Sequence, residues 1–251
     1  MKLLSIGNSF SVDAHHYLHD LAKSGGVNIE CYNLYIGGCY LKRHWENYMN
    51  KSEDYELFIN GIKERMISIN EALEMEKWDI ITLQQASGSS TKWETYEPYL
   101  GNLYAVIEVL CPDATVYIHK TWAYEELKYR DLFTGNLTEN QALMYEQLSD
   151  CYERAAENIG VEIIPAGTVI QYLRDNTEEF KPKPDGLFLT CDGFHLSIIY
   201  GRYAAALTWY SKLTGRRPHT AKLVPEFGED RGDEKILGVI KDSVEKVLKV
   251  M

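Results

Sequence analysis

The sequence lacks any apolar run long enough to cross a membrane. A spanning helix needs about 20 mainly apolar residues, and the runs found here are far shorter. Residues 1–4 lead directly into a predicted strand, without the apolar core and the small-residue cleavage site of a secretion signal. We therefore expect a soluble, cytoplasmic protein with no membrane partner, although removal of a leader would make a secreted or periplasmic location compatible with the sequence.

Positive charge is also scarce. Lys and Arg number 26 against 37 Asp and Glu, which gives a formal net charge of −11. Binding to nucleic acid through its phosphates requires clustered basic side chains. The one basic cluster, Arg216 and Arg217 with Lys212, is interpreted as the solvated end of a helix. No nucleic-acid partner is expected.

Paired cysteines are absent as well. The five cysteines are irregularly spaced and form no CxxC motif, so the signatures of a disulfide scaffold or a zinc site are missing. His15 and His19 lie four residues apart on a predicted helix, but no third ligand accompanies them. The sequence also has no GxGxxG motif and no Walker lysine. We expect neither a metal nor a cofactor.

What the sequence does contain is an alternation of short apolar segments with longer helical patterns. This alternation predicts βαβ units and a parallel sheet covered by helices on both faces. Strands are predicted at residues 2–6, 28–35, 79–83, 115–119 and 162–165. Helices are predicted at residues 12–23, 55–75, 98–110, 138–159, 168–174, 196–213 and 233–250. No repeat or linker interrupts the pattern, which indicates a single domain over residues 1–251.

Three segments without a regular pattern each follow a predicted strand: 37–50, 84–95 and 120–137. In a parallel α/β sheet, ligands bind in the crevice beyond the carboxyl ends of the strands. These segments are therefore expected to surround one cleft.

The first strand ends in Gly7-Asn8-Ser9 and leads into a helix. A sharp turn between a strand and a helix is a common way to display a nucleophile. Backbone N–H groups at the start of the helix can stabilise negative charge beside it. Ser9 is therefore a candidate nucleophile.

A serine hydroxyl needs a base, and Asp192-Gly193-Phe194-His195 can supply one. An aspartate three residues before a histidine can accept the Nδ1 hydrogen and turn the Nε2 lone pair toward Ser9. The alternative is an Asp helix cap beside a histidine that merely packs, because so short a motif often arises by chance.

Taken together, the motifs resemble those of the SGNH/GDSL hydrolase family. Gly-Asn-Ser follows the first strand, Gly37-Gly38 follows the second, and Asp-x-x-His lies near the end of the chain. The resemblance implies a three-layer α/β/α domain with a five-stranded parallel sheet of flavodoxin-like type. It also implies a Ser9, His195 and Asp192 triad, with N–H groups of Ser9 and Gly38 in the oxyanion hole.

One motif departs from the family pattern. Where the family has Gly-x-Asn-Asp after the third strand, with the asparagine as an oxyanion donor, this chain has Gln84-Gln85-Ala86. A glutamine amide offers the same two N–H donors on a longer stem. We choose Gln85 as the oxyanion donor, and Gln84 is the competing choice. This pattern also resembles a bacterial branch of the family that carries glutamine in place of the asparagine.

Aromatic residues are frequent in and near the three segments. Flat rings there could stack on a sugar, and packing within a lid explains them equally well. Trp93 and Trp122 are the candidate substrate-binding residues, and replacing Trp122 by alanine is expected to raise KM. The aromatic residues of these segments are Trp45, Trp93, Tyr96, Tyr99, Trp122, Tyr124 and Tyr129.

The sequence thus predicts a serine esterase that hydrolyses small acyl esters, above all acetyl esters, with acylated sugars as the leading substrate class. Two alternatives stay open. One is a non-catalytic module on the hydrolase scaffold that binds carbohydrate or an acyl ligand. The other is an acyltransferase that uses the same triad.

Overall fold

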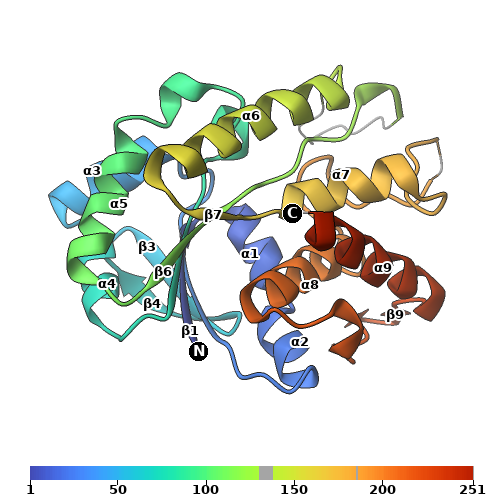
Figure 1. The fold of residues 1–251 in the computed structure, drawn as a ribbon, viewed down its shortest axis with the longest axis horizontal. Coiled ribbons are helices and arrows are strands. Elements are labelled where there is room, and N and C mark those ends of the chain that lie inside the picture. Colours follow the sequence, from blue (N-terminus) through green and yellow to red (C-terminus); the bar gives the residue numbers. More distant parts are fainter. Residues whose placement is uncertain (130–137, 185, 251) are drawn as a thin grey trace.

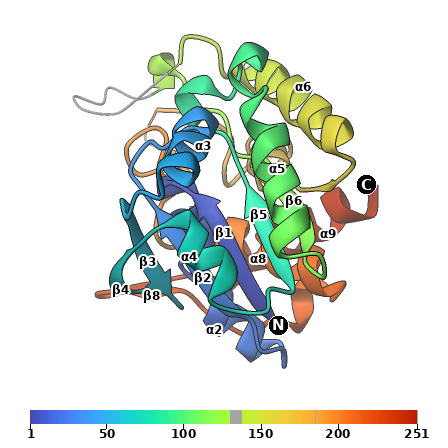
Figure 2. The ribbon, with the colours of Figure 1, turned by 90° about the vertical axis from the view of Figure 1, so that its left-hand side faces the viewer.

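The computed structural model describes residues 1–129, 138–184 and 186–250. Its centre is a mixed sheet (Figures 1 and 2). Five of its strands run parallel: β1 (Lys2–Gly7), β2 (Glu30–Tyr35), β5 (Ile80–Leu83), β6 (Thr115–His119) and β7 (Glu162–Ile164). Their spatial order, β2-β1-β5-β6-β7, is the flavodoxin-like arrangement. The α/β class predicted from the sequence is confirmed, and the five predicted strands run parallel to one another.

The sheet has seven strands rather than the predicted five, and the helix predicted over residues 55–75 is wrong except at residues 69–74. Instead, β3 (Tyr55–Ile59) and β4 (Ile62–Ile67) form an antiparallel hairpin that extends the sheet beyond β2. The cause is the Asn60-Gly61 pair, whose φ values of 51° and 83° suit a two-residue hairpin turn. Asn60 Oδ1 also accepts the N–H of Cys31 at 2.9 Å, which joins the turn to β2.

Helices cover both faces of the sheet, as Figure 2 shows. One layer consists of α1 (Ser9–His15), α2 (Leu18–Ser24), α7 (Ala166–Asn176), α8 (Gly201–Thr214) and α9 (Glu234–Val250). The other consists of α3 (Leu41–Asn50), α4 (Ile69–Glu74), α5 (Tyr99–Leu110) and α6 (Gln141–Ile159). The shorter elements are η1 (Ser87–Ser89), η2 (Trp93–Thr95), η3 (Leu127–Tyr129), η4 (Pro218–Thr220), β8 (Glu226–Phe227) and β9 (Asp230–Arg231).

Alternating side chains of β1 supply both cores. Leu3 belongs to the cluster that includes α1 and α8, whereas Leu4 and Ile6 belong to the cluster that includes α5 and α6. All three are buried. Burying each such side chain contributes about 1.5–3 kcal/mol, which makes β1 one of the strands that hold the two layers together.

Most predicted helices are present with shifted ends, but two segments differ. The segment 37–50 is not irregular throughout, because α3 occupies its second half. The predicted helix 12–23 is divided into α1 and α2. Of the predicted rim segment 120–137, residues 130–137 lie outside the described residues.

The chain leaves β1 toward one face of the sheet and β5 toward the other, since α1 and α5 belong to opposite layers. Neighbouring parallel strands with this arrangement open a crevice between their carboxyl ends. Ser9 follows β1 and Ser87 follows β5. In the described ranges, each helix is too short or too polar to cross a lipid bilayer.

Candidate active site

The turn between β1 and α1 sets the position of Ser9. Asn8 has an extended backbone with φ −145°, and its Oδ1 accepts the N–H of Phe10 at 3.0 Å. This is an N-cap, which starts the helix at Ser9. A Cβ at Gly7 would lie 2.4 Å from Ser11 Oγ, so the close turn requires glycine there.

His195 and Asp192 meet Ser9 as the motifs predict. His195 Nε2 lies 2.9 Å from Ser9 Oγ, and His195 Nδ1 lies 2.7 Å from Asp192 Oδ2. A carboxylate accepts hydrogen, so this arrangement assigns the ring hydrogen to Nδ1 and the lone pair to Nε2. The His195 ring is therefore oriented to take a proton from Ser9.

Asp192 is held by its own turn as well as by the ring. Its Oδ1 accepts the N–H groups of Phe194 at 3.1 Å and His195 at 2.7 Å. Burial raises the pKa of Asp192, but the hydrogen bonds from the His195 ring and these two N–H groups outweigh burial and leave the pKa below its usual value. Asp192 is thus ionised at neutral pH.

Three bonds fix the loop that carries His195. Trp122 Nε1 donates to the Phe194 carbonyl at 2.6 Å, and the N–H of Glu125 donates to the Gly193 carbonyl at 2.8 Å. On the other side, Asp13 Oδ2 accepts the N–H of Leu196 at 2.7 Å. These bonds connect the loop to α1 and to the segment after β6.

Asp13 is a buried carboxylate on α1. Its Oδ1 lies 2.9 Å from Arg202 Nε of α8. Burial raises its pKa to about 6, although the Arg202 charge and the Leu196 N–H act in the opposite direction. The carboxylate therefore joins α1, α8 and the His195 loop.

A pocket of about 540 Å³ opens above Ser9. This volume is within the range of small-molecule sites. A second hollow of about 400 Å³ adjoins it and shares Ser87, Gly88 and Tyr124 with it. The first pocket is lined by Asn8, Ser9, Phe10, Tyr35, Gly37, Gly38, Tyr40, Ala86, Ser87, Gly88, Ser89, Tyr124, Phe194 and His195.

The backbone N–H groups of Ser9 and Gly38 are among those of the pocket lining that meet no acceptor within the part of the chain that the structure describes. Gly38 has φ +61°, a left-handed conformation that favours glycine. Free N–H groups beside a nucleophile can stabilise an oxyanion. The structure thus brings Ser9, Asp192, His195 and Gly38 together.

The prediction that Gln85 faces this pocket is wrong. Its Nε2 donates to the Thr95 carbonyl at 2.9 Å and hydroxyl at 3.1 Å. Its Oε1 accepts the N–H groups of Leu41 and Ala86 at 3.0 and 2.9 Å. The amide has no group left for a substrate and instead connects α3 to the segment after β5. The competing candidate, Gln84, is also buried and bonded to other side chains.

Trp93 and Trp122 do not line the pocket either. Trp122 is buried, with its ring stacked on Phe10 at a centroid distance of 4.4 Å. Trp93 stacks on Tyr96 and lies 4.2 Å below the Arg154 guanidinium. Trp122 thus packs inside the protein and the partly exposed Trp93 packs on its neighbours, which corrects the prediction that the two rings bind substrate.

Other aromatic residues form the pocket walls instead. Of the aromatic set singled out in the sequence, Tyr124 is found in the lining, whereas the side chain of Tyr129 lies outside the described residues. Tyr35 and Phe194 also line the pocket but were not predicted to do so. Tyr35 ends β2, and Phe194 directly precedes His195. Their positions beside a strand end and within the Asp-x-x-His motif could have indicated that they line the pocket.

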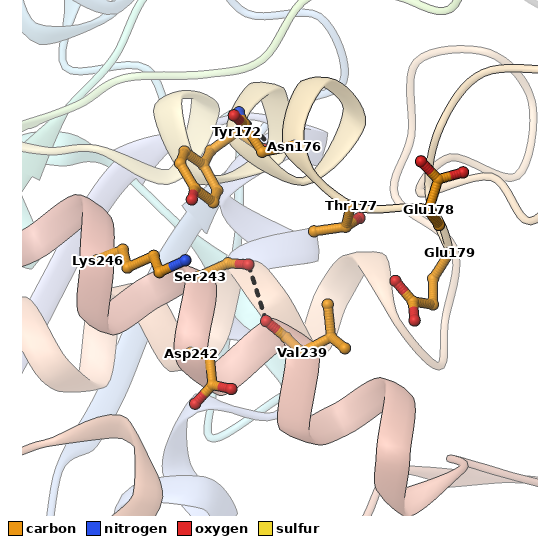
Figure 3. Close-up of a pocket in the computed structure, with 9 residues that line it drawn as sticks. All are labelled: Tyr172, Asn176, Thr177, Glu178, Glu179, Val239, Asp242, Ser243 and Lys246. Carbon is orange, nitrogen blue, oxygen red and sulfur yellow. Dashed lines mark hydrogen bonds between the residues drawn. The ribbon is translucent and has the colours of Figure 1, made fainter.

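Another hollow, of about 310 Å³, lies between α7 and α9 (Figure 3). It shares no residue with the Ser9 pocket. Its one serine, Ser243, donates its hydroxyl to the Val239 carbonyl at 2.8 Å, and it has no histidine beside it. The lining of this hollow therefore lacks the serine–histidine pair of the Ser9 pocket. Over the described ranges, no three His, Cys, Asp or Glu side chains gather in a way that would hold a metal ion.

Comparisons with known proteins agree with this fold. A DUF4886 family protein from Bacteroides uniformis is 33% identical, with a TM-score of 0.84 over 99% of this chain and 95% of its own. A protein from Slackia heliotrinireducens, assigned provisionally to the SGNH hydrolases, is 20% identical with a TM-score of 0.58 over 85% and 98%. An acetyl xylan esterase is 15% identical with a TM-score of 0.53 over 85% and 100%. The last two likenesses concern the fold alone.

The comparison with curated proteins gave no match. A family model described as a domain of unknown function, DUF4886, matches residues 2–234. With this match and the relative from Bacteroides uniformis, the chain belongs to the DUF4886 family, and its fold is that of the SGNH hydrolases.

Proposed function

We propose that the protein is a serine ester hydrolase that removes small acyl groups, acetyl first among them, from carbohydrate. The observation that carries this proposal is the pair of contacts at His195: 2.9 Å to Ser9 Oγ and 2.7 Å to Asp192 Oδ2, at the wall of an open pocket. A hydroxyl, a neutral imidazole and a carboxylate in this order form the arrangement of a nucleophile, base and orienting group.

In the proposed reaction, Ser9 Oγ attacks the ester carbonyl while His195 Nε2 takes its proton. The imidazolium that forms is stabilised by Asp192. The N–H groups of Ser9 and Gly38 bind the oxyanion of the tetrahedral intermediate. The alcohol leaves with the proton from His195, and an acyl-Ser9 ester remains. Water then attacks this ester, His195 again takes and returns a proton, and the carboxylic acid leaves.

The pocket walls support carbohydrate as the alcohol portion. An acetyl group would fill only a small part of the 540 Å³, and the adjoining hollow adds further space. Tyr35, Tyr40 and Tyr124 offer flat rings with hydroxyl groups, which suit the faces and edges of a sugar. The acetyl xylan esterase of the same fold acts, by its name, on an acylated carbohydrate.

The test is a panel of p-nitrophenyl esters and acetylated sugars, assayed with the wild type, Ser9→Ala and the control Ser89→Ala. Ser89 also lines the pocket, but the hydrogen bond of His195 Nε2 goes to Ser9 Oγ. We expect hydrolysis by the wild type and by Ser89→Ala, and a loss with Ser9→Ala. Equal rates for all three would refute the proposal. Acyl transfer to an added sugar that exceeds hydrolysis would instead show a transferase.

A further inference from the structure

A buried chain of hydrogen bonds crosses the sheet directly below the pocket. His119 Nδ1 lies 2.8 Å from Gln84 Oε1, and Gln84 Nε2 donates to Asn8 Oδ1 at 2.8 Å. Asn8 Nδ2 in turn donates to the Cys39 carbonyl at 3.0 Å. The four residues are 0 to 3% exposed. They come from the carboxyl ends of β6, β5, β1 and β2, which are neighbours in the sheet.

Each bond in the chain has a defined direction. The Cys39 carbonyl can only accept, so Asn8 must present its Nδ2 to it and its Oδ1 to Gln84. The Phe10 N–H, which also donates to Asn8 Oδ1, fixes the same orientation. Gln84 therefore turns Nε2 to Asn8 and Oε1 to His119, and His119 must carry its hydrogen on Nδ1.

His119 stays neutral in this position. Burial lowers its pKa to about 3, and the neighbouring His15 acts in the same direction. Among the described residues, the Nε2 atom of His119 has no hydrogen-bond partner. The chain thus ends at a neutral ring with one fixed tautomer, and its polarity does not change near neutral pH.

The two ends of the chain adjoin the two backbone donors of the pocket. Asn8 directly precedes Ser9, and Cys39 directly follows Gly38. Their connection through the Asn8 side chain fixes the Ser9 turn against the Gly37-Gly38 loop. Catalytic rates are sensitive to such placement, since an error of about 1 Å can cost about 100-fold.

We propose that Gln84 is a positioning residue: it orients Asn8, and Asn8 fixes the spacing between the Ser9 and Gly38 N–H groups that bind the oxyanion. This inference rests on the proposed ester hydrolysis. It gives the glutamine after β5 a role different from direct donation to the substrate, because its amide is bonded to Asn8 and His119.

The length of the Gln84 side chain is needed for this role. Its amide spans the gap between His119 and Asn8, and an asparagine would be shorter by one CH₂, about 1.5 Å. Gly7 leaves the space for it, since a Cβ at Gly7 would lie 3.3 Å from Gln84 Cδ. A shorter amide could reach one of the two partners but not both.

The test compares Gln84→Asn and Gln84→Met with the control Gln171→Met. Gln171 is a buried glutamine of α7, and the bonds found for its Nε2 in the described ranges go to Asp175, outside the pocket. Hydrolysis of p-nitrophenyl acetate gives kcat, KM and the pH profile, and thermal unfolding gives Tm.

We expect both Gln84 variants to lower kcat about 10- to 100-fold with KM changed less than about 3-fold. The acid side of the pH profile should stay in place, because Asp192 and His195 are untouched. Gln171→Met should keep the wild-type kcat even where its Tm falls. Gln84→Asn keeps a polar side chain and serves as the measurable variant if Gln84→Met does not fold.

A wild-type kcat in folded Gln84→Asn, with Tm lowered or not, would overturn the inference and leave the proposed function intact. A drop in kcat for Gln171→Met equal to that of the Gln84 variants would also overturn it. A wild type that hydrolyses no ester and gives no adduct at Ser9 would instead refute the proposed function, and the inference with it.

Discussion

His195 Nε2 lies 2.9 Å from Ser9 Oγ, although the two residues are 186 positions apart in the sequence. The contact depends on α1 and on the loop before α8, which pack in the same layer of the domain. The hydrogen bonds on both sides of the His195 loop hold these two distant residues in contact. The first three predictions concern that loop and the pocket around it.

Asp13→Asn should lower both stability and activity. It removes the charge that pairs with Arg202 and places an amide N–H group near the guanidinium. We expect a loss of about 2–4 kcal/mol in the free energy of unfolding. This is at the lower end of the range for breaking a buried ion pair, because the Arg202 side chain is partly exposed. We also expect a several-fold lower kcat, since Leu196 adjoins His195. Urea unfolding and ester hydrolysis measure the two effects, and Asp20→Asn, at an exposed position of α2, is the control. Wild-type values for both would contradict the account.

Gly38→Ala should reduce activity more than stability. A Cβ at Gly38 would meet no atom within 4 Å, so its effect comes only from the φ of +61°. The strain costs about 1 kcal/mol and turns the N–H group away from the oxyanion. Loss of one such donor lowers kcat about 100- to 1000-fold.

Gly61→Ala is the matched control for Gly38→Ala. It has φ +83° and equally open space, but it lies in the β3–β4 hairpin. It should lose similar stability and keep its kcat. An equal kcat for the two variants would remove Gly38 from the proposed oxyanion hole.

Tyr124→Ala and Trp122→Ala should act in different ways. Tyr124 lines the pocket, and its removal should raise KM for an acetylated sugar about 3- to 10-fold, which corresponds to one aromatic contact. Trp122 is buried against Phe10, and its removal should cost about 3–5 kcal/mol in the free energy of unfolding. A higher KM for folded Trp122→Ala with unchanged stability would restore it as a substrate-binding residue.

Stability should fall as the pH drops below about 6.5. Burial lowers the pKa of His15, His44 and His119 to about 3. Below about pH 6.5, the pKa of a histidine in the unfolded chain, the unfolded chain binds protons that the folded protein does not. The free energy of unfolding therefore decreases as the pH falls. The loss reaches about 2 kcal/mol per histidine at pH 5. The raised pKa of Asp13 acts in the opposite direction over a similar range, but with a smaller total.

Urea unfolding at pH 7, 6 and 5 measures this dependence. His44→Gln keeps a hydrogen-bonding group near Tyr55. It should reduce the slope of the free energy of unfolding against pH by about the contribution of one buried histidine. His219→Asn is the control, because His219 lies on the surface. A slope of zero between pH 7 and 5 in the wild type would contradict the assignment of these buried histidines as neutral.

The parallel sheet and the residues around Ser9 could be predicted because their signals are local. Apolar segments mark the strands, and Gly7-Asn8-Ser9 and Asp192-x-x-His195 each keep their groups within a few residues. The topology of a parallel sheet then brings the strand ends to one edge. The β3–β4 hairpin had a local signal too, in Asn60-Gly61, but the helical pattern assumed over residues 55–75 hid it.

The partners of Gln85 and Trp122 could not be predicted in the same way. Whether the Gln85 amide faces a pocket or bonds to Thr95 and Leu41 depends on how α3 and the segment after β5 fold against each other. A tryptophan in a rim segment can likewise turn inward, as Trp122 does toward Phe10. Sequence position constrains the backbone of such residues but not the direction of the side chain.

The most direct test of the central claim is covalent labelling of Ser9 by a fluorophosphonate or by phenylmethylsulfonyl fluoride, read by mass spectrometry of the intact protein and its peptides. We expect one adduct per chain, located at Ser9, with loss of ester hydrolysis. We also expect no adduct in Ser9→Ala, and a kcat of that variant that is lower than the wild-type value by about 10⁴-fold or more. An unlabelled wild type, an adduct at Ser89 in place of Ser9, or full hydrolysis by Ser9→Ala would contradict the proposed role of Ser9 as the nucleophile.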